Sequence, residues 1–183
     1  MGEAKQVMLL GRKPMLKHVV DAFLSSSLTT TTLVLNPTVK WRPRPGKRLR
    51  AVVNRHPEDG LSSSLRLGLA SIPRRIEAAV IGLGDKPLLS SSTIDSLVDE
   101  FRATGSDIIV PTYRGKSGNP ILFGRSTFDE LSRLKGDVGG KALIKRDPNR
   151  ATVVPVDDAG VLLDVDTPSD FRRVARLFSG RRP

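Results

Sequence analysis

Apolar residues recur at helical spacing in several stretches of the chain. In residues 16–24 they occupy positions i, i+3, i+4, i+7 and i+8, which places them on one face of a helix. Residues 60–72 and 94–101 carry similar apolar faces, and Thr167 with Pro168 begins a further amphipathic helix as N-cap and first helical residue. The same pattern predicts short helices near residues 126–134 and 139–145.

Apolar and β-branched segments alternate with these helices and predict strands. They comprise residues 29–36, 51–54, 78–84, 107–113, 119–124 and 151–156. The segment 78–84 is almost wholly apolar, which is typical of a strand covered on both faces. Because strands and helices alternate with short connections, the pattern predicts one α/β domain over residues 1–183, with a mainly parallel sheet between two helical layers. Ligands of such sheets bind beyond the carboxyl ends of the strands.

Composition narrows the class of protein. The chain has 183 residues, enough for one domain with a sizeable core. It contains no cysteine, which excludes disulfides and thiolate metal sites and is consistent with a cytoplasmic protein. No apolar run approaches the roughly 18 residues that would span a bilayer, so we expect no membrane partner.

The chain is strongly basic. Thirty Lys and Arg against nineteen Asp and Glu give a net charge of +11, which predicts attraction to nucleic acid, anionic lipid or phosphorylated small molecules. A basic cluster surrounds Trp41 in residues 40–50. The alternative is that basic residues merely cover the surface. Aromatic residues make up only 4% of the chain, which leaves little to stack on bases and disfavours nucleic-acid binding.

The strongest local motif is the sequence GLGDKPLLSSSTI, in which the apolar strand runs into Gly84 and Asp85. A carboxylate at the end of a central strand can hold Mg²⁺, which prefers one or two carboxylates plus water and phosphate oxygens. Gly84 would let a ligand approach the backbone closely. The alternative is that Asp85 is only a turn residue ahead of Pro87.

A second acidic motif, LLDVDTPSDF, comes near the end of the chain. Asp164 and Asp166 flank Val165, so in an extended chain both carboxylates point to the same side. They could complete a metal site with Asp85, or one of them could assist the helix cap. Two acidic strand ends in one α/β domain form a frame suited to a metal and a nucleotide.

Three serines precede the helix predicted over residues 60–72. Ser62, Ser63 and Ser64 follow a glycine, and such a turn offers hydroxyl and backbone N–H donors to an anion or a base. Ordinary capping of the helix is the alternative.

The ordered set of motifs resembles one family across nearly the whole chain. The segments EDGLSSSLRLGLA, GLGDKPLLSSSTID, GNPILFGRSTFDEL, KGDVGGKALIKRDP and LLDVDTPSDF are similar to those of molybdenum cofactor cytidylyltransferases and related molybdopterin-guanine dinucleotide biosynthesis enzymes. The resemblance implies a Rossmann-like domain of the nucleotide-diphospho-sugar transferase type. It also implies transfer of CMP from CTP to a molybdopterin-type phosphate, with Mg²⁺ as cofactor and pyrophosphate as product.

The resemblance also implies roles for individual residues. Asp85 and Asp166 are similar to Mg²⁺ ligands, and Asp164 is a weaker candidate. Lys5 resembles the lysine that contacts the triphosphate, and the serines at 62–64 and Gly84 resemble parts of the nucleotide pocket. A molybdoenzyme that receives the cofactor is a further partner the resemblance suggests.

The chain departs from the family at its beginning. Family members start with an apolar strand and a Gly-rich loop that ends in Met-Gly, whereas this chain starts at Met1 and Gly2. We therefore expect that Met1 is an internal methionine of the natural protein, which sequencing of the DNA upstream would test. If the short form is the natural one, we expect weak or absent nucleotide binding.

Other functions stay open on the sequence alone. The same chemistry could use GTP, or another acceptor such as a sugar or alcohol phosphate. Under an alternative hypothesis from a different class, the chain is a non-catalytic basic nucleic-acid-binding protein or an insertion chaperone for a molybdoenzyme. Asp85 and Asp166 discriminate between these classes, because only a transferase needs them.

Overall fold

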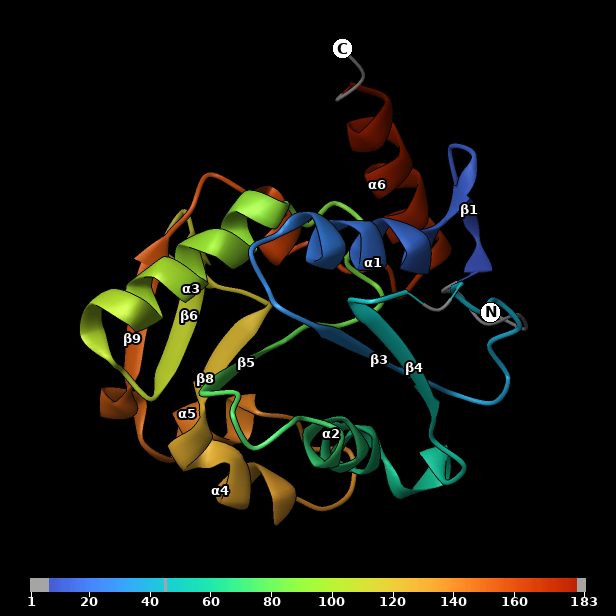
Figure 1. Cartoon of the computed structure of the whole chain (residues 1–183). Coiled ribbons are helices and arrows are strands. Elements are labelled where there is room, and N and C mark those ends of the chain that lie inside the picture. The colour runs from blue at the N-terminus through green and yellow to red at the C-terminus, as the bar shows by residue number, and fades with distance from the viewer. Residues whose placement is uncertain (1–6, 45, 181–183) are drawn as a thin grey trace.

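The computed structural model describes residues 7–44 and 46–180, in which strands lie between two layers of helices (Figure 1). One layer contains α1 (Met15–Ser25), α3 (Ser91–Thr104) and α6 (Pro168–Gly180). The other contains α2 (Leu61–Ala70), α4 (Phe128–Ser132) and α5 (Lys141–Arg146). The predicted three-layer α/β class is confirmed.

The strands form one larger sheet and two pairs. The larger sheet has the order β5–β8–β6–β7, with β9 on β6. Its members are β5 (Ala78–Ile81), β6 (Ile108–Tyr113), β7 (Lys116–Ser117), β8 (Ile121–Gly124) and β9 (Ala151–Pro155). A separate parallel pair consists of β3 (Thr31–Leu35) and β4 (Leu49–Val53), and a short antiparallel pair consists of β1 (Leu9–Leu10) and β2 (Lys13–Pro14).

Strand directions in the larger sheet are mixed. β6 and β9 are parallel, whereas β8 is antiparallel to both β5 and β6. The reason lies in the short connection after β6, where Arg114 and Gly115 have φ values of 49° and 76° and form a tight turn into β7. Such a turn joins antiparallel strands. The sequence pattern did not predict β7, because it has only two residues.

The helices follow the predicted apolar faces. α1 buries Leu16, Val19, Val20 and Phe23, as the periodicity predicts, and also Met15. Leu24, the last residue of the predicted face, is only half-buried. The N-cap of α3 is Ser90, whose hydroxyl accepts a hydrogen bond from the backbone N–H of Ser92. That helix ends at Gly105, which has a left-handed φ of 65°.

Apolar clusters join both helical layers to the sheet. One cluster, between the sheet and helices α2, α4 and α5, includes Leu65, Phe123 and Leu143. Another packs α1 and α3 near Phe23 and Ile94. None of the helices in the described part of the chain is long and apolar enough to cross a membrane.

Several strands pair on one side only within the described residues, among them β3 and β5. β5 is the last strand of the larger sheet, and β3 pairs only with β4. The side-chain hydroxyl of Thr31, at the start of β3, is buried without a hydrogen-bond partner there. Among residues 7–44 and 46–180, no strand connects the pair to the larger sheet.

Candidate active site

The loop after β5 carries the Gly-Asp-Lys-Pro motif. β5 ends at Ile81, so the strand is shorter than predicted and Asp85 lies four residues beyond it. Gly82 packs against the ring of Phe23 on α1, and a Cβ at Gly82 would lie 2.5 Å from the Phe23 Cζ atom. A glycine is therefore required for the loop to pass this close to α1.

The second acidic motif lies beside this loop. The backbone N–H of Val165 donates a hydrogen bond of 3.1 Å to the carbonyl oxygen of Asp85. Val165 is fully buried, whereas Asp164 and Asp166 on either side of it are exposed. The structure thus brings together two segments that are about 80 residues apart in sequence.

Lys86 is buried between these two acidic segments. Its side chain is 4% exposed, and its Nζ atom lies 3.8 Å from Oδ2 of Asp164. Burial lowers the pKa of Lys86 below its ordinary value, because the interior solvates a charge poorly. The carboxylates of Asp164 and Asp85 oppose that shift most, and Asp166 adds a smaller opposing effect. Lys86 and the carboxylates of Asp85, Asp164 and Asp166 therefore lie within one small region.

Lys141 belongs to the surroundings of this cluster. It is the first residue of α5 and is exposed, and its positive charge lowers the pKa of Lys86 further. The sequence pattern did not single it out, because Lys141 lies in a glycine-rich segment whose spacing does not fit a phosphate-binding P-loop. Electrostatic proximity to Lys86 is visible only in the folded chain.

Asp158 fixes the same region without facing solvent. Its carboxylate is 5% exposed and accepts hydrogen bonds from the N–H of Ser90 (2.8 Å), the hydroxyl of Thr93 (2.9 Å) and the N–H of Gly160 (2.8 Å). These bonds tie the start of α3 to the segment that leads to Val165. Gly160 in turn approaches the Leu88 carbonyl so closely that a Cβ would lie 2.4 Å from its oxygen.

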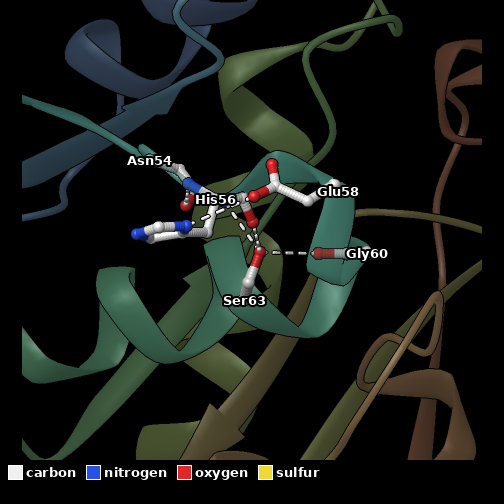
Figure 2. Close-up of polar contacts among 5 residues, drawn as sticks. All are labelled: Asn54, His56, Glu58, Gly60 and Ser63. Carbon is white, nitrogen blue, oxygen red and sulfur yellow. Dashed lines mark hydrogen bonds and ion pairs between the residues drawn. The ribbon is translucent and has the colours of Figure 1, made fainter.

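The three serines have structural hydrogen bonds. Figure 2 shows that Ser63 lies between the end of β4 and the turn that begins α2. Its hydroxyl accepts a bond of 2.7 Å from the Asn54 amide and lies 2.8 Å and 3.1 Å from the carbonyl oxygens of Gly60 and His56. Asn54 is itself 5% exposed and also donates to Ser64 (3.0 Å).

Ser62 is fully enclosed and Ser64 is half-buried. The Ser62 hydroxyl accepts a hydrogen bond from Arg66, and the Ser62 N–H donates to the Gly136 carbonyl. Gly60 contacts the same backbone, where a Cβ would lie 2.4 Å from the Gly136 carbonyl carbon. Partners of these serine hydroxyls thus lie within residues 54–66, so Ser62 and Ser63 hold the turn that begins α2. Neither of them caps the helix, because its N-cap is Gly60 and no side chain caps it. Ser64 is the least buried of the three serines.

A cavity of about 440 Å³ lies next to the start of α2. It is lined by Asp59, Arg66, Ser132, Arg133, Leu134, Lys135 and Gly136. The Arg66 guanidinium, which lies in it, is bonded to the Leu134 carbonyl at 2.7 Å and to Ser62. The cavity is therefore shaped by the contacts that hold the serine turn in place.

The structure describes one of the two remaining site residues predicted from the sequence, Gly84, and does not describe the other, Lys5. Lys5 lies outside the described residues. Gly84 is half-buried in the loop directly before Asp85.

The donor set determines which metal arrangement is feasible. In the described residues no group of three or more His, Cys, Asp or Glu side chains is close enough to hold a metal ion. Mg²⁺ bound together with a nucleotide needs only one or two carboxylates, since water and phosphate oxygens complete its shell. Asp85 and Asp166 offer two carboxylates from segments that the Val165–Asp85 hydrogen bond joins. An all-protein metal cage does not fit the described residues.

Comparison with known proteins identifies the family. A sequence model described as the MobA-like NTP transferase domain matches residues 1–152. The chain belongs to this family. Such domains are nucleotidyltransferases, and this membership favours the enzyme over the nucleic-acid-binding and chaperone alternatives.

Similar proteins agree with the family assignment. The chain is 33% identical over 104 residues to the purine catabolism protein PucB of Bacillus subtilis, a match that spans 56% of this chain and 49% of PucB. The chain thus covers about half the length of that relative. A Mycobacterium sp. strain JC1 homologue of Rv0371c is 26% identical with a TM-score of 0.85, and the match covers 100% of this chain and 91% of that one.

A second solved structure carries a metal. Rv0371c of Mycobacterium tuberculosis H37Rv in complex with manganese is 28% identical, with a TM-score of 0.81 and coverage of 96% of this chain and 93% of that one. The fold of the MobA-like domain described above is therefore shared with these structures over almost the whole chain.

Proposed function

We propose that this MobA-like nucleotidyltransferase transfers CMP from CTP to a molybdopterin-type phosphate and depends on Mg²⁺. The observation that carries the proposal is the Val165–Asp85 hydrogen bond, which holds the Asp164–Asp166 segment beside the Gly-Asp-Lys-Pro loop. The manganese complex of Rv0371c supports a divalent ion in this family.

The reaction is an in-line displacement at the α-phosphorus of the triphosphate. An oxygen of the acceptor phosphate forms a new P–O bond, the bond to the β-phosphate breaks, and pyrophosphate leaves with the electron pair. When bound, the metal supplies charge neutralisation at the phosphate oxygens. In this proposal Asp85 and Asp166 hold it, Lys5 contacts the triphosphate and Ser64 contacts the nucleotide.

The protein's own contribution is alignment. Hydrogen bonds to the Asp158 carboxylate hold the start of α3 against the segment that precedes Val165. The Val165 N–H in turn binds the carbonyl oxygen of Asp85. Phosphoryl transfer needs little covalent chemistry from the protein, so rigid placement of charge accounts for most of its effect.

Pyrophosphate release tests the proposal. The protein is incubated with each of the four NTPs, Mg²⁺ and molybdopterin, and with sugar and alcohol phosphates as competing acceptors. We expect release that is fastest with CTP and molybdopterin, and a loss of at least about 100-fold in Asp85→Asn. Asp129→Asn, an exposed residue of α4, is the matched control and should keep full activity.

Each outcome is informative. Equal rates with GTP or with another acceptor would contradict the assignment of base or acceptor. Full activity of Asp85→Asn would contradict the metal role of that carboxylate.

A further inference from the structure

Lys86 presents an unusual combination of burial and charge. Its side chain is 4% exposed, yet it lies within the region where the protein's acidic segments meet. A buried ammonium is costly unless carboxylates surround it. Here Asp164 faces it at 3.8 Å, and Asp85 and Asp166 act on it electrostatically.

The backbone fixes Lys86 in this place. Lys86 follows Asp85, whose carbonyl oxygen is bonded to Val165, and the Lys86 carbonyl accepts a hydrogen bond of 3.2 Å from the N–H of Leu89. Leu88 and Leu89 are buried next to it. The side chain therefore cannot move into solvent without disturbing a packed loop.

We propose that Lys86 is the built-in counter-cation of these carboxylates and a positioning residue for the metal site. This inference rests on the proposed function, because it assigns the metal to Asp85 and Asp166. Lys86 binds Asp164 and keeps that carboxylate out of the metal's coordination shell. It also opposes entry of a divalent ion alone, so the ion binds well only when a triphosphate contributes negative charge.

Electrostatics explains the direction of the effect. A fixed positive charge in a poorly solvated place repels a divalent cation nearby, and removal of that charge strengthens cation binding. The same charge attracts phosphate oxygens. A lysine at this position thus couples metal binding to nucleotide binding without contributing a ligand.

Binding of Mn²⁺ without nucleotide tests this role. Free Mn²⁺ is measured by electron paramagnetic resonance in titrations of the full chain and its variants. We expect Lys86→Met to bind Mn²⁺ at least about tenfold more tightly than the parent. Lys145→Met removes the same charge from an exposed position of α5 and should change the affinity less than about twofold.

Asp164→Asn provides the second variant, and it decides the question if Lys86→Met does not fold. Asp164 pairs with Lys86 and is not a ligand in this proposal. The fold loss of Mn²⁺ affinity in Asp164→Asn should therefore be at least about tenfold smaller than the fold loss in Asp85→Asn. Circular dichroism spectra establish that each variant is folded.

The outcomes separate this inference from the proposed function. Unchanged or weaker Mn²⁺ binding in folded Lys86→Met would overturn the role of Lys86, as would equal losses in Asp164→Asn and Asp85→Asn. Absence of Mn²⁺ binding in both the parent and Lys86→Met would overturn it too. If the Mn²⁺ pattern is as expected but no NTP yields pyrophosphate, only the assigned reaction fails.

Discussion

Asn54 is the residue whose replacement most directly tests the serine turn. Its amide donates hydrogen bonds to Ser63 (2.7 Å) and Ser64 (3.0 Å), and its side-chain oxygen accepts one from the N–H of His56 (3.0 Å). The residue is 5% exposed, so water cannot replace these partners in Asn54→Ala. The variant leaves an N–H and two hydroxyls with fewer bonds.

The magnitude follows from the number of bonds. Three side-chain hydrogen bonds at about 1 kcal/mol each predict a loss of about 3 kcal/mol in the free energy of unfolding. For a domain of this size, that corresponds to a fall in Tm of roughly 6–12 °C. This is a large part of the stability of an ordinary domain.

Urea denaturation followed by circular dichroism measures the loss, provided that the slope of free energy against urea is unchanged. Asn149→Ala is the control, since Asn149 is exposed and should shift the free energy by less than about 0.5 kcal/mol. Ser63→Ala, combined with Asn54→Ala in a double-mutant cycle, should show coupling. A loss below about 1 kcal/mol in Asn54→Ala would refute the argument that this turn depends on Asn54.

Three further predictions concern the surroundings of the site. Asp158→Ala removes the acceptor of three hydrogen bonds, two of them buried, and should lower the free energy of unfolding by at least about 3 kcal/mol, measured by urea denaturation; a loss near zero would show that the carboxylate does not hold α3. Thr167→Ala removes the hydroxyl that accepts from the Asp170 N–H at the start of α6, and should lower stability by about 1 kcal/mol in thermal melts, with Ser179→Ala at the other end of the helix nearly neutral. Hydrogen bonds from the Thr167 hydroxyl and N–H lower the pKa of Asp170, so its stabilising effect is present above the unfolded pKa and is lost as pH falls through the folded one. Between neutral pH and pH values below about 4, the free energy of unfolding should therefore fall less in Asp170→Asn than in the parent. Equal falls would contradict the assigned cause.

The order of helices and strands could be predicted because it depends on local periodicity. The apolar face of residues 16–24 and the strands predicted at residues 29–36 and 151–156 correspond to α1, β3 and β9. The length of β5 could not be predicted, since Gly82 leaves the sheet to pass Phe23, and only tertiary packing shows that. The strand directions could not be predicted either, because they depend on a tight turn at Arg114 that leaves no signal in the apolar pattern.

The candidate site was predictable only in part. Motif spacing pointed to Asp85, Asp164 and Asp166, and the fold places these segments side by side through Val165. Lys86 was adjacent in the motif, but its burial and its approach to Asp164 are visible only in the folded chain. Asp158 had no signal of its own, because a structural carboxylate and an exposed one look alike in sequence.

Within the described residues, β3 and β5 each have one edge that no strand pairs with, and such edges bear on behaviour at high concentration. An edge strand presents N–H and C=O groups that can pair with a strand of another molecule. β5 reads Ala-Ala-Val-Ile and has no charged side chain to prevent such pairing. The high net charge of +11 opposes close approach of two molecules at low ionic strength. Added salt screens this repulsion, so any self-association through strand edges that stay unpaired should increase with ionic strength.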